Sequence, residues 1–294
     1  MKLYKTTLTP ISNFATTLKG DTLFGQICWA IRYTFGETKL ESLLSNYESS
    51  PFLVVSDGFA TGFVPKPSLP SSLLSEDSDK KKENRKKIWL TLKELQNGEF
   101  NQAKTDDEVG NKSKTIATVK NSLNYKTFTT DDSGTFAPYS ERESAISPKD
   151  VYFLVSDSFT LDELQSALNT VSQMGFGKNA SIGKGFFTFS TFEEIKLTQT
   201  SKTLMTLSPA VLEGQSIKKA YYEPFTRFGK HGADLANKNP FKKPLLLANS
   251  GAIVVFDESY TKPYIGKAIK GHSSHQNTVH QGYGIVIPTK ELNQ

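Results

Sequence analysis

Hydrophobic and polar positions at the start of the chain predict a strand followed by a helix. Residues 1–8 alternate between the two classes, which favours an edge-accessible strand. Residues 22–35 carry apolar side chains at helical spacing, with Asp21 as the expected N-cap and Gly36 as the expected stop. The expected buried face consists of Leu23, Ile27, Ala30 and Ile31.

The next segment predicts two short strands and then a long polar excursion. The stretch FLVVSDGFATGFVPKP favours two strands around a Ser-Asp-Gly turn, and a mixed-charge stretch after it is expected to become helical near Trp89. Residues 115–140 alternate on both sides of an Asp-Asp-Ser-Gly turn, but their apolar content is too small for a core. We therefore expect a long β-hairpin that projects from the body.

A second strand–helix–strand unit follows the excursion. VYFLVSD predicts a buried strand, and Thr160 with Glu163 predicts a capping box at the start of the next helix. A glycine-rich loop and an aromatic strand complete the β-α-β-β-α-β order of a ferredoxin-like domain. This domain spans residues 1–198 with an insertion at about 66–145. Residues 199–294 are strand-rich with little helix, so we expect a second, smaller domain and an α+β fold class overall.

Composition narrows the class of protein without assigning a function. A length of 294 residues suits about two domains that each bury a core, and no run of 18 apolar residues is present. The amino terminus lacks the apolar segment of a signal peptide, and Cys28 is the single cysteine. We therefore expect a cytoplasmic protein without membrane spans or internal disulfides.

The net positive charge of the protein comes from the last third of the chain. Residues 1–200 hold 23 Lys and Arg against 24 Asp and Glu, a balance of −1, whereas residues 201–294 hold 12 against 6, a balance of +6. This asymmetry indicates an anionic partner near the C-terminal part.

The glycine-rich stretch QMGFGKNASIGKGFF is the main candidate site. A Walker loop needs four residues between its glycines and a Ser or Thr after its lysine, and this stretch has neither. GFGKNA satisfies a loose dinucleotide pattern, but the loop leaves a helix and enters a strand, so no helix start would face a pyrophosphate. Glycines with exposed N–H groups can form an anion-binding concavity, which favours an RNA backbone. The alternative is a helix–strand connection whose lysines serve solubility.

Four stretches together give the chain a resemblance to RAMP proteins of CRISPR effector complexes. They are the glycine loop, LKGDTLFGQICWAIRYTFGE, VKNSLNYKTFTTDDSGTFAPYS and VHQGYGIVIP. The last three are similar to the first loop and helix, the thumb hairpin and the C-terminal strand of the type III-A (Csm) subunit that caps the crRNA 5′ handle. The resemblance implies two ferredoxin-like (RRM-like) domains, the second degenerate, with a thumb and a glycine loop.

The resemblance also implies a non-catalytic, RNA-binding role without cofactor or metal. Such a subunit grips the crRNA 5′ handle, docks a large polymerase-like subunit and a backbone RAMP subunit, and meets target RNA only through the complex. The residues implied to contact RNA lie in the first loop, the thumb and the glycine loop: Lys19, Asp21, Thr22; Asn121, Tyr125, Phe136; Gly175, Gly177, Lys178, Asn179, Ser181, Gly183, Lys184 and Gly185. Tyr125 and Lys126 stand where such thumbs usually have an arginine.

Two other classes of function remain open from the residues alone. A RAMP-type crRNA-processing endoribonuclease would use a histidine as general acid or base, but residues 9–21 contain none. Three histidines in GHSSHQNTVH lack a zinc motif, so we expect a solvated or RNA-facing loop there. The stretch KKAYYEPFTRFGKHG mixes aromatic and basic residues, which suits a protein interface as well as RNA.

Overall fold

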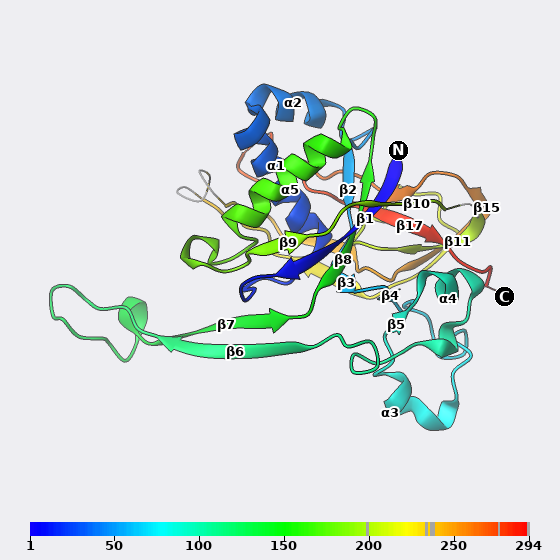
Figure 1. Ribbon diagram of the computed structural model, residues 1–294, viewed down its shortest axis with the longest axis horizontal. Coiled ribbons are helices and arrows are strands. Elements are labelled where there is room, and N and C mark those ends of the chain that lie inside the picture. The colour runs from blue at the N-terminus through cyan, green and yellow to red at the C-terminus, as the bar shows by residue number, and fades with distance from the viewer. Residues whose placement is uncertain (198–199, 233–234, 236–238, 276, 293–294) are drawn as a thin grey trace.

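The computed structural model describes residues 1–197, 200–232, 235, 239–275 and 277–292. The domain boundary that we predicted between residues 198 and 199 lies outside the described residues. The chain combines helices with antiparallel sheets, which confirms the predicted α+β class. A long hairpin extends beyond the rest of the molecule (Figure 1).

The first sheet has β1 (Lys2–Pro10) in its interior. One side of β1 pairs with β8 (Lys149–Val155), and the other side pairs with β9 (Phe187–Phe189) and β10 (Glu193–Ile195). The outer edge of β8 pairs with two short strands on either side of the Ser-Asp-Gly turn, β2 (Leu53–Val55) and β3 (Phe59–Ala60). The prediction that the first strand is accessible at an edge is therefore wrong, because it is paired on both sides.

Three longer helices accompany this sheet: α1 (Gly20–Phe35), α2 (Glu37–Ser45) and α5 (Leu161–Met174). Helix α1 begins two residues earlier than expected, so Asp21 lies in its first turn and is not its N-cap. Gly36 ends this helix at φ 89°, as predicted. Helix α5 has the predicted capping box, in which the Thr160 hydroxyl and the Glu163 carboxylate each accept the other residue's backbone N–H.

The insertion after β3 forms a small lobe of short elements. These are β4 (Val64–Pro65), η1 (Ser78–Lys80), α3 (Lys81–Asn84), β5 (Trp89–Leu90), α4 (Leu92–Asn97) and η2 (Phe100–Gln102). Trp89 lies in a strand that pairs with β4, and the following helix begins at Leu92, which corrects the helix expected near Trp89. Leu90, Leu95 and Phe100 are buried inside the lobe.

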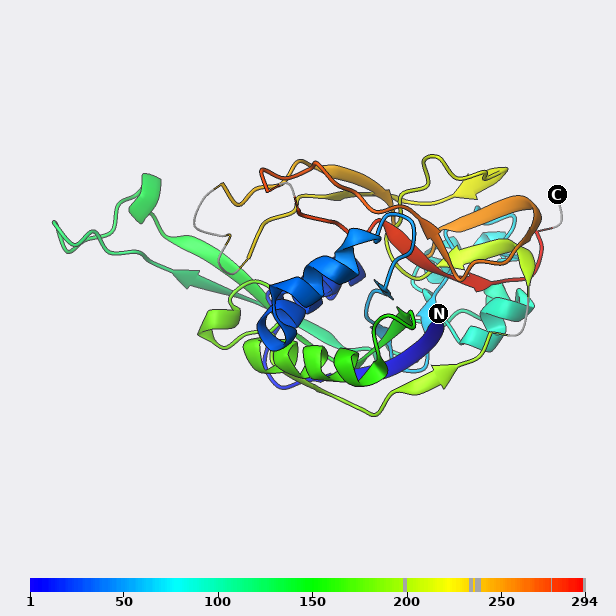
Figure 2. The ribbon, with the colours of Figure 1, turned by 90° about the horizontal axis from the view of Figure 1, so that it is seen from above.

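The hairpin consists of β6 (Ser113–Lys120) and β7 (Tyr139–Ile146), paired from Ser113↔Ile146 to Lys120↔Tyr139. No side chain of either strand is fully buried, and Figure 2 shows the pair reaching away from the body. The strands are longer at the base than the predicted range of 115–140. Residues 121–138 form an irregular tip, in which the predicted Asp-Asp-Ser-Gly turn is one bend and not the closing turn.

A second antiparallel sheet follows in the order β12 (Lys219–Tyr221), β15 (Ile253–Tyr260), β11 (Ser201–Thr206), β17 (Tyr283–Pro288) and β16 (Tyr264–Gly266). A two-stranded ribbon joins β13 (Pro224–Arg227) to β14 (Leu245–Ala248). Within the described part of residues 200–292, no α-helix is present. The strand-rich character predicted for the last third of the chain is therefore confirmed.

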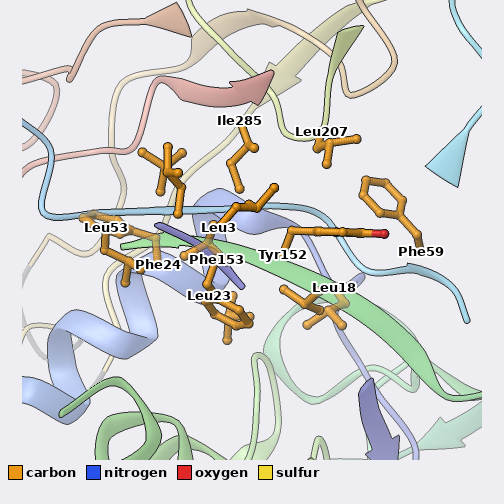
Figure 3. Packing of buried hydrophobic residues seen from close by; sticks show 14 of the residues in the cluster. Leu3, Leu18, Leu23, Phe24, Leu53, Phe59, Tyr152, Phe153, Leu207 and Ile285 are labelled. Carbon is orange, nitrogen blue, oxygen red and sulfur yellow. The ribbon is translucent and has the colours of Figure 1, made fainter. Parts of the chain in front are cut away.

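The two sheets share one hydrophobic core. The largest buried cluster joins residues of the first sheet and α1 to Met205, Leu207, Ile285 and Ile287 of the second part. In Figure 3, Leu207 and Ile285 lie above the strand that carries Phe153, and Leu23 lies below it. A smaller cluster covers the other face of the second sheet. The expectation that each part buries a separate core is therefore wrong for the main core.

Candidate nucleic-acid interface

The glycine loop joins α5 to β9 and includes a short 3₁₀-helix, η4 (Ala180–Ile182). Its four glycines, Gly175, Gly177, Gly183 and Gly185, all have positive φ, between 75° and 90°. Side chains are strained in this region of backbone conformation, so glycine is the favoured residue at each position. The four glycines of the loop therefore stand where the backbone conformation favours glycine.

Three of these glycines are needed for contacts within the chain. A Cβ atom at Gly185 would lie 2.1 Å from the Phe176 carbonyl oxygen, and one at Gly175 would lie 2.5 Å from the Lys184 carbonyl oxygen. A Cβ at Gly177 would meet the Thr16 side chain at 2.5 Å. Only Gly183 of the four has open space around its Cβ position. The loop thus uses its glycines mainly to fold against itself and the loop after β1.

Most backbone donors of the loop also have internal acceptors. Lys178 N–H donates to the Thr16 hydroxyl at 2.8 Å, and Gly185 N–H donates to the Asn13 carbonyl at 2.9 Å. Carbonyl groups inside the loop or in α5 accept further N–H groups, those of Gly175, Phe176, Ile182, Gly183 and Lys184. The predicted concavity of successive free N–H groups is therefore largely occupied by the chain itself.

An exposed rim remains at the outer side of the loop. Ser181 and Gly183 are exposed, as are the side chains of Lys178 (60%) and Ile182 (58%). This rim offers a hydroxyl, an ammonium group and a glycine with open space beside it. Such groups suit contact with a phosphate or a ribose.

Strand β7 of the hairpin lies against the loop through two glutamates, Glu141 and Glu143, in the middle of the strand. Glu141 accepts from Lys178 Nζ at 3.1 Å and from Asn179 Nδ2 at 3.0 Å, and it also pairs with Lys120 of β6. Glu143 pairs with Lys184 Nζ at 2.5 Å and accepts from Asn13 Nδ2 at 2.9 Å. One residue separates the glutamates, so they project from the same face of the strand.

These contacts lower the pKa of both carboxyl groups. The Lys120 ammonium, followed by Asn179 and Lys178, lowers the pKa of Glu141 to about 2. Lys184 and then Asn13 lower the pKa of Glu143. Both groups are therefore ionised at neutral pH. The glutamates were not among the predicted site residues, although a Glu-x-Glu pair in a strand beside a lysine-bearing loop is a visible signal.

Lys19, Asp21 and Thr22 lie at the start of α1, in the interior between the two parts of the chain. Lys19 Nζ donates to Asp57 Oδ2 at 2.7 Å and to Asn249 Oδ1 at 2.8 Å. Arg227 of β13 donates to both oxygens of Asp21 at 2.5 and 2.6 Å. The Thr22 hydroxyl lies 3.4 Å from Asp21 Oδ1. Lys19 and Asp21 therefore connect the start of α1 to the second part of the chain. The Asp21 carboxylate is buried and does not face an open groove.

Asp57 links this network to the helix start. Its carboxylate accepts the Gly20 N–H at 2.8 Å and the Ser250 hydroxyl at 2.7 Å. Burial raises the pKa of Asp57, whereas Lys19 and the hydrogen bonds act in the opposite direction. The sequence pattern predicted only a turn at the Ser-Asp-Gly segment, and it did not indicate that the Asp57 carboxylate would bind Lys19 and the start of α1.

The hairpin tip carries the other predicted RNA contacts. Asn121 is exposed, Phe136 is half-buried, and the side chain of Tyr125 is 87% exposed. Phe128 is 77% exposed and has φ 58°, an uncommon conformation for an aromatic residue. The rings of Tyr125 and Phe128 therefore do not pack on the body of the hairpin. They are available for contact with another molecule.

All four histidines lie close together in the second part, and three of them are buried. The rings of His231 and His275 are 5.0 Å apart, and those of His272 and His280 are 5.6 Å apart. Burial lowers the pKa of His231, His272 and His280 to about 4, so these three side chains are neutral at pH 7. The prediction of a solvated or RNA-facing histidine loop is therefore wrong for His272 and His280.

Metal binding and membrane insertion are two further properties that the structure bears on. Among the described residues, no three or more His, Cys, Asp and Glu side chains come together in a way that could hold a metal ion. No described helix is both long and apolar enough to cross a bilayer.

The fold of this chain is similar to that of chains in solved structures. No family model and no curated protein matches the sequence. Solved structures do match: a chain in the crystal structure of a Csm1–Csm4 cassette with AMPPNP has a TM-score of 0.62 and 19% identity, with 100% of both chains covered. The same cassette with cA4 gives a TM-score of 0.61 and 20% identity over both full chains.

A second kind of assembly gives a similar result. A chain of the Csm3–Csm4 subcomplex of the type III-A CRISPR-Cas interference complex has a TM-score of 0.61 and 15% identity, with 99% of this chain and 100% of that chain covered. At these identities the comparison establishes the fold. Over its full length, the chain therefore has a fold found in solved type III-A CRISPR assemblies, as its resemblance to RAMP proteins predicted.

Proposed function

We propose that the chain is a non-catalytic, RNA-binding subunit of a type III-A CRISPR interference complex and that it grips the crRNA 5′ handle. The observation that carries the proposal is the full-length likeness of fold to chains of two such assemblies. The exposed rim of the glycine loop beside a projecting hairpin supports the choice of RNA as ligand.

In this proposal the first sheet with α1 and α5 is a ferredoxin-like domain, residues 1–198, with the insertion at about 66–145. Its sheet order, with β9 and β10 next to β1, then β8, then β2 and β3, supports that assignment. Residues 199–294 form the degenerate second domain, which retains a sheet but no described helix. The hairpin is the thumb, and residues 175–185 are the RAMP glycine loop.

The proposed RNA contacts follow the exposed groups. Lys178, Ser181 and Lys184 bind the backbone of the handle, with Asn179 beside them and the four loop glycines shaping the rim. At the hairpin tip, Asn121 offers hydrogen bonds, and Tyr125 and Phe136 stack on unpaired bases. Stacking contributes about 1–3 kcal/mol per base.

The segment before α1 supports the same site. Thr16, four residues before this helix, accepts the Lys178 N–H, so this segment helps to position the loop. Lys19 and Thr22 remain proposed RNA contacts, whereas we omit Asp21, because its carboxylate is buried and bound by Arg227.

The proposed protein partners are a large polymerase-like subunit and a backbone RAMP subunit, and target RNA is met only through the complex. The structures that share the fold are named as Csm1–Csm4 and Csm3–Csm4 assemblies, which supports these two classes of partner. Nothing in the arrangement of histidines favours the endoribonuclease alternative, because His231, His272 and His280 are enclosed and neutral at pH 7.

The double substitution Lys178→Glu with Lys184→Glu tests the proposal. In a purified complex assembled with its partners and crRNA, we expect roughly tenfold less crRNA per complex, because two phosphate contacts become repulsive. The measurement is the ratio of RNA to protein after affinity purification.

The matched control is Lys218→Glu with Lys267→Glu. These surface lysines also pair with carboxylates, of Asp257 and Glu213, but lie in the second part of the chain. The control changes the net charge equally and should leave the RNA content unchanged. Normal RNA content in the loop variant would contradict the proposal.

A further inference from the structure

The lysines proposed to bind RNA already have anionic partners within the chain. Lys178 and Asn179 both contact Glu141, and Lys184 contacts Glu143. The three ammonium groups of Lys120, Lys178 and Lys184 and the two carboxylates give this cluster a charge of 3 − 2 = +1. Without RNA, the loop is therefore much less cationic than its lysines alone suggest.

A carboxylate and a phosphate compete for the same donors. Both accept charge-assisted hydrogen bonds from an ammonium group at similar distances. An ammonium group with three N–H donors can bridge the two anions, but a phosphate held beside the two carboxylates is repelled by them. Phosphate binding therefore favours displacement of the glutamates.

Each glutamate has a second partner outside the loop. Glu141 retains Lys120 on the neighbouring strand, and Glu143 retains Asn13. Release of the two loop lysines would therefore leave Glu141 paired with the Lys120 ammonium, and Glu143 hydrogen-bonded to the neutral Asn13 amide. This arrangement lowers the cost of exchanging carboxylate for phosphate, because a buried charge that loses all its partners is what makes a broken ion pair expensive.

We propose that Glu141 and Glu143 are internal competitors for RNA phosphate at the glycine loop, and that RNA binding releases strand β7 of the hairpin from this loop. The proposal rests on the function proposed above and adds its regulation. The hairpin remains attached through the backbone pair of Phe14 and Ser144, whose N–H groups donate to each other's carbonyls at 2.9 and 2.8 Å. Occupation of the loop and the position of the hairpin are thus coupled.

The test compares the wild-type chain with the variant Glu141→Gln/Glu143→Gln. The probe is a fluorescein-labelled 12-nucleotide single-stranded RNA, and binding is followed by anisotropy across a salt series. We expect the variant to bind about two to thirty times more tightly, the range for removing the ion pairs of the two loop lysines. Its log–log salt slope should also be steeper by roughly 0.7, because the wild-type Glu143 carboxylate takes up a cation when Lys184 turns to a phosphate, whereas the glutamine does not.

The control is Glu48→Gln/Glu213→Gln. These exposed glutamates also pair with lysines, Lys270 and Lys267, so the control removes the same charge and the same kind of ion pair elsewhere. It should bind RNA like the wild type. If the hairpin variant is no tighter than this control, the proposal is overturned.

A distance measurement tests the coupling directly. Spin labels at Ser181→Cys and Lys126→Cys, in a chain whose native cysteine is removed by Cys28→Ser, report the separation of the loop and the hairpin tip. RNA should shift the wild-type distance distribution towards that of the RNA-free Glu141→Gln/Glu143→Gln variant. An unchanged distribution in both comparisons would overturn the release step.

Failure of this inference can be told from failure of the proposed function. If Lys178→Glu/Lys184→Glu abolishes binding of the same RNA but Glu141→Gln/Glu143→Gln has no effect, the loop binds RNA and the glutamates do not compete. If the lysine variant binds RNA like the wild type, the proposed function itself fails.

Discussion

At the scale of single residues, the glycines of the loop have two different reasons for their identity. Gly185 has both a positive φ of 75° and a carbonyl oxygen at 2.1 Å from its missing Cβ. Gly183 has a positive φ of 90° but nothing within 4 Å of that position. The first glycine holds the loop together, and the second only shapes the rim.

Substitution by alanine should separate these two reasons. Gly183→Ala should lower the free energy of unfolding by about 1–2 kcal/mol, the cost of a left-handed conformation. Gly185→Ala should lower it by about 2–5 kcal/mol, because displacing the Phe176 backbone adds roughly 1–3 kcal/mol to the same strain. Chemical denaturation measures both values. Equal losses would show that the close approach at Gly185 relaxes without cost.

At the scale of elements, the hairpin is an addition to the fold and not a part of its core. No side chain in β6 or β7 is buried, and residues 121–138 at the tip form no regular strand pairing. The hairpin contacts the body through the Phe14–Ser144 backbone pair and through Glu141 and Glu143 of β7. Its tip is free to serve a partner.

Deletion of residues 124–135 with a short Gly-Ser replacement should leave a folded protein. The melting temperature should change by no more than about 3 °C, because the removed segment buries no core side chain. Binding geometry on the guide should change, since Tyr125 and Phe128 are lost. Loss of soluble protein, or a large drop in melting temperature, would contradict this assignment of the tip.

Elements with strong local signals could be predicted from the sequence, whereas long-range contacts could not. The Thr160–Glu163 capping box and the Gly36 stop are set by neighbouring residues, and both are confirmed. The side chain of Gln281 hydrogen-bonds to both the N–H and the carbonyl group of Val55, 226 positions away. No local sequence pattern indicates these bonds. The contacts of Glu141 and Glu143 with the loop are long-range too, although the Glu-x-Glu spacing itself is visible in the sequence.

At the scale of the whole molecule, two sheets function as one packed body. The main core crosses from one to the other, and the ion pairs of Lys19 with Asp57 and of Asp21 with Arg227 lie between them. The excess of positive charge after residue 200 is thus partly used inside the molecule, by Arg227. The charge asymmetry alone therefore overstates the cationic surface of the second part, and the RNA site is better located from the loop and the hairpin.

The central claim is that this chain holds one defined end of a guide RNA. The most direct measurement is sequencing of the small RNAs that co-purify with the affinity-tagged chain in its complex. We expect the co-purified small RNAs to vary in internal sequence and to share one 5′ end. RNAs with random 5′ ends, or no enrichment over an untagged control, would contradict it.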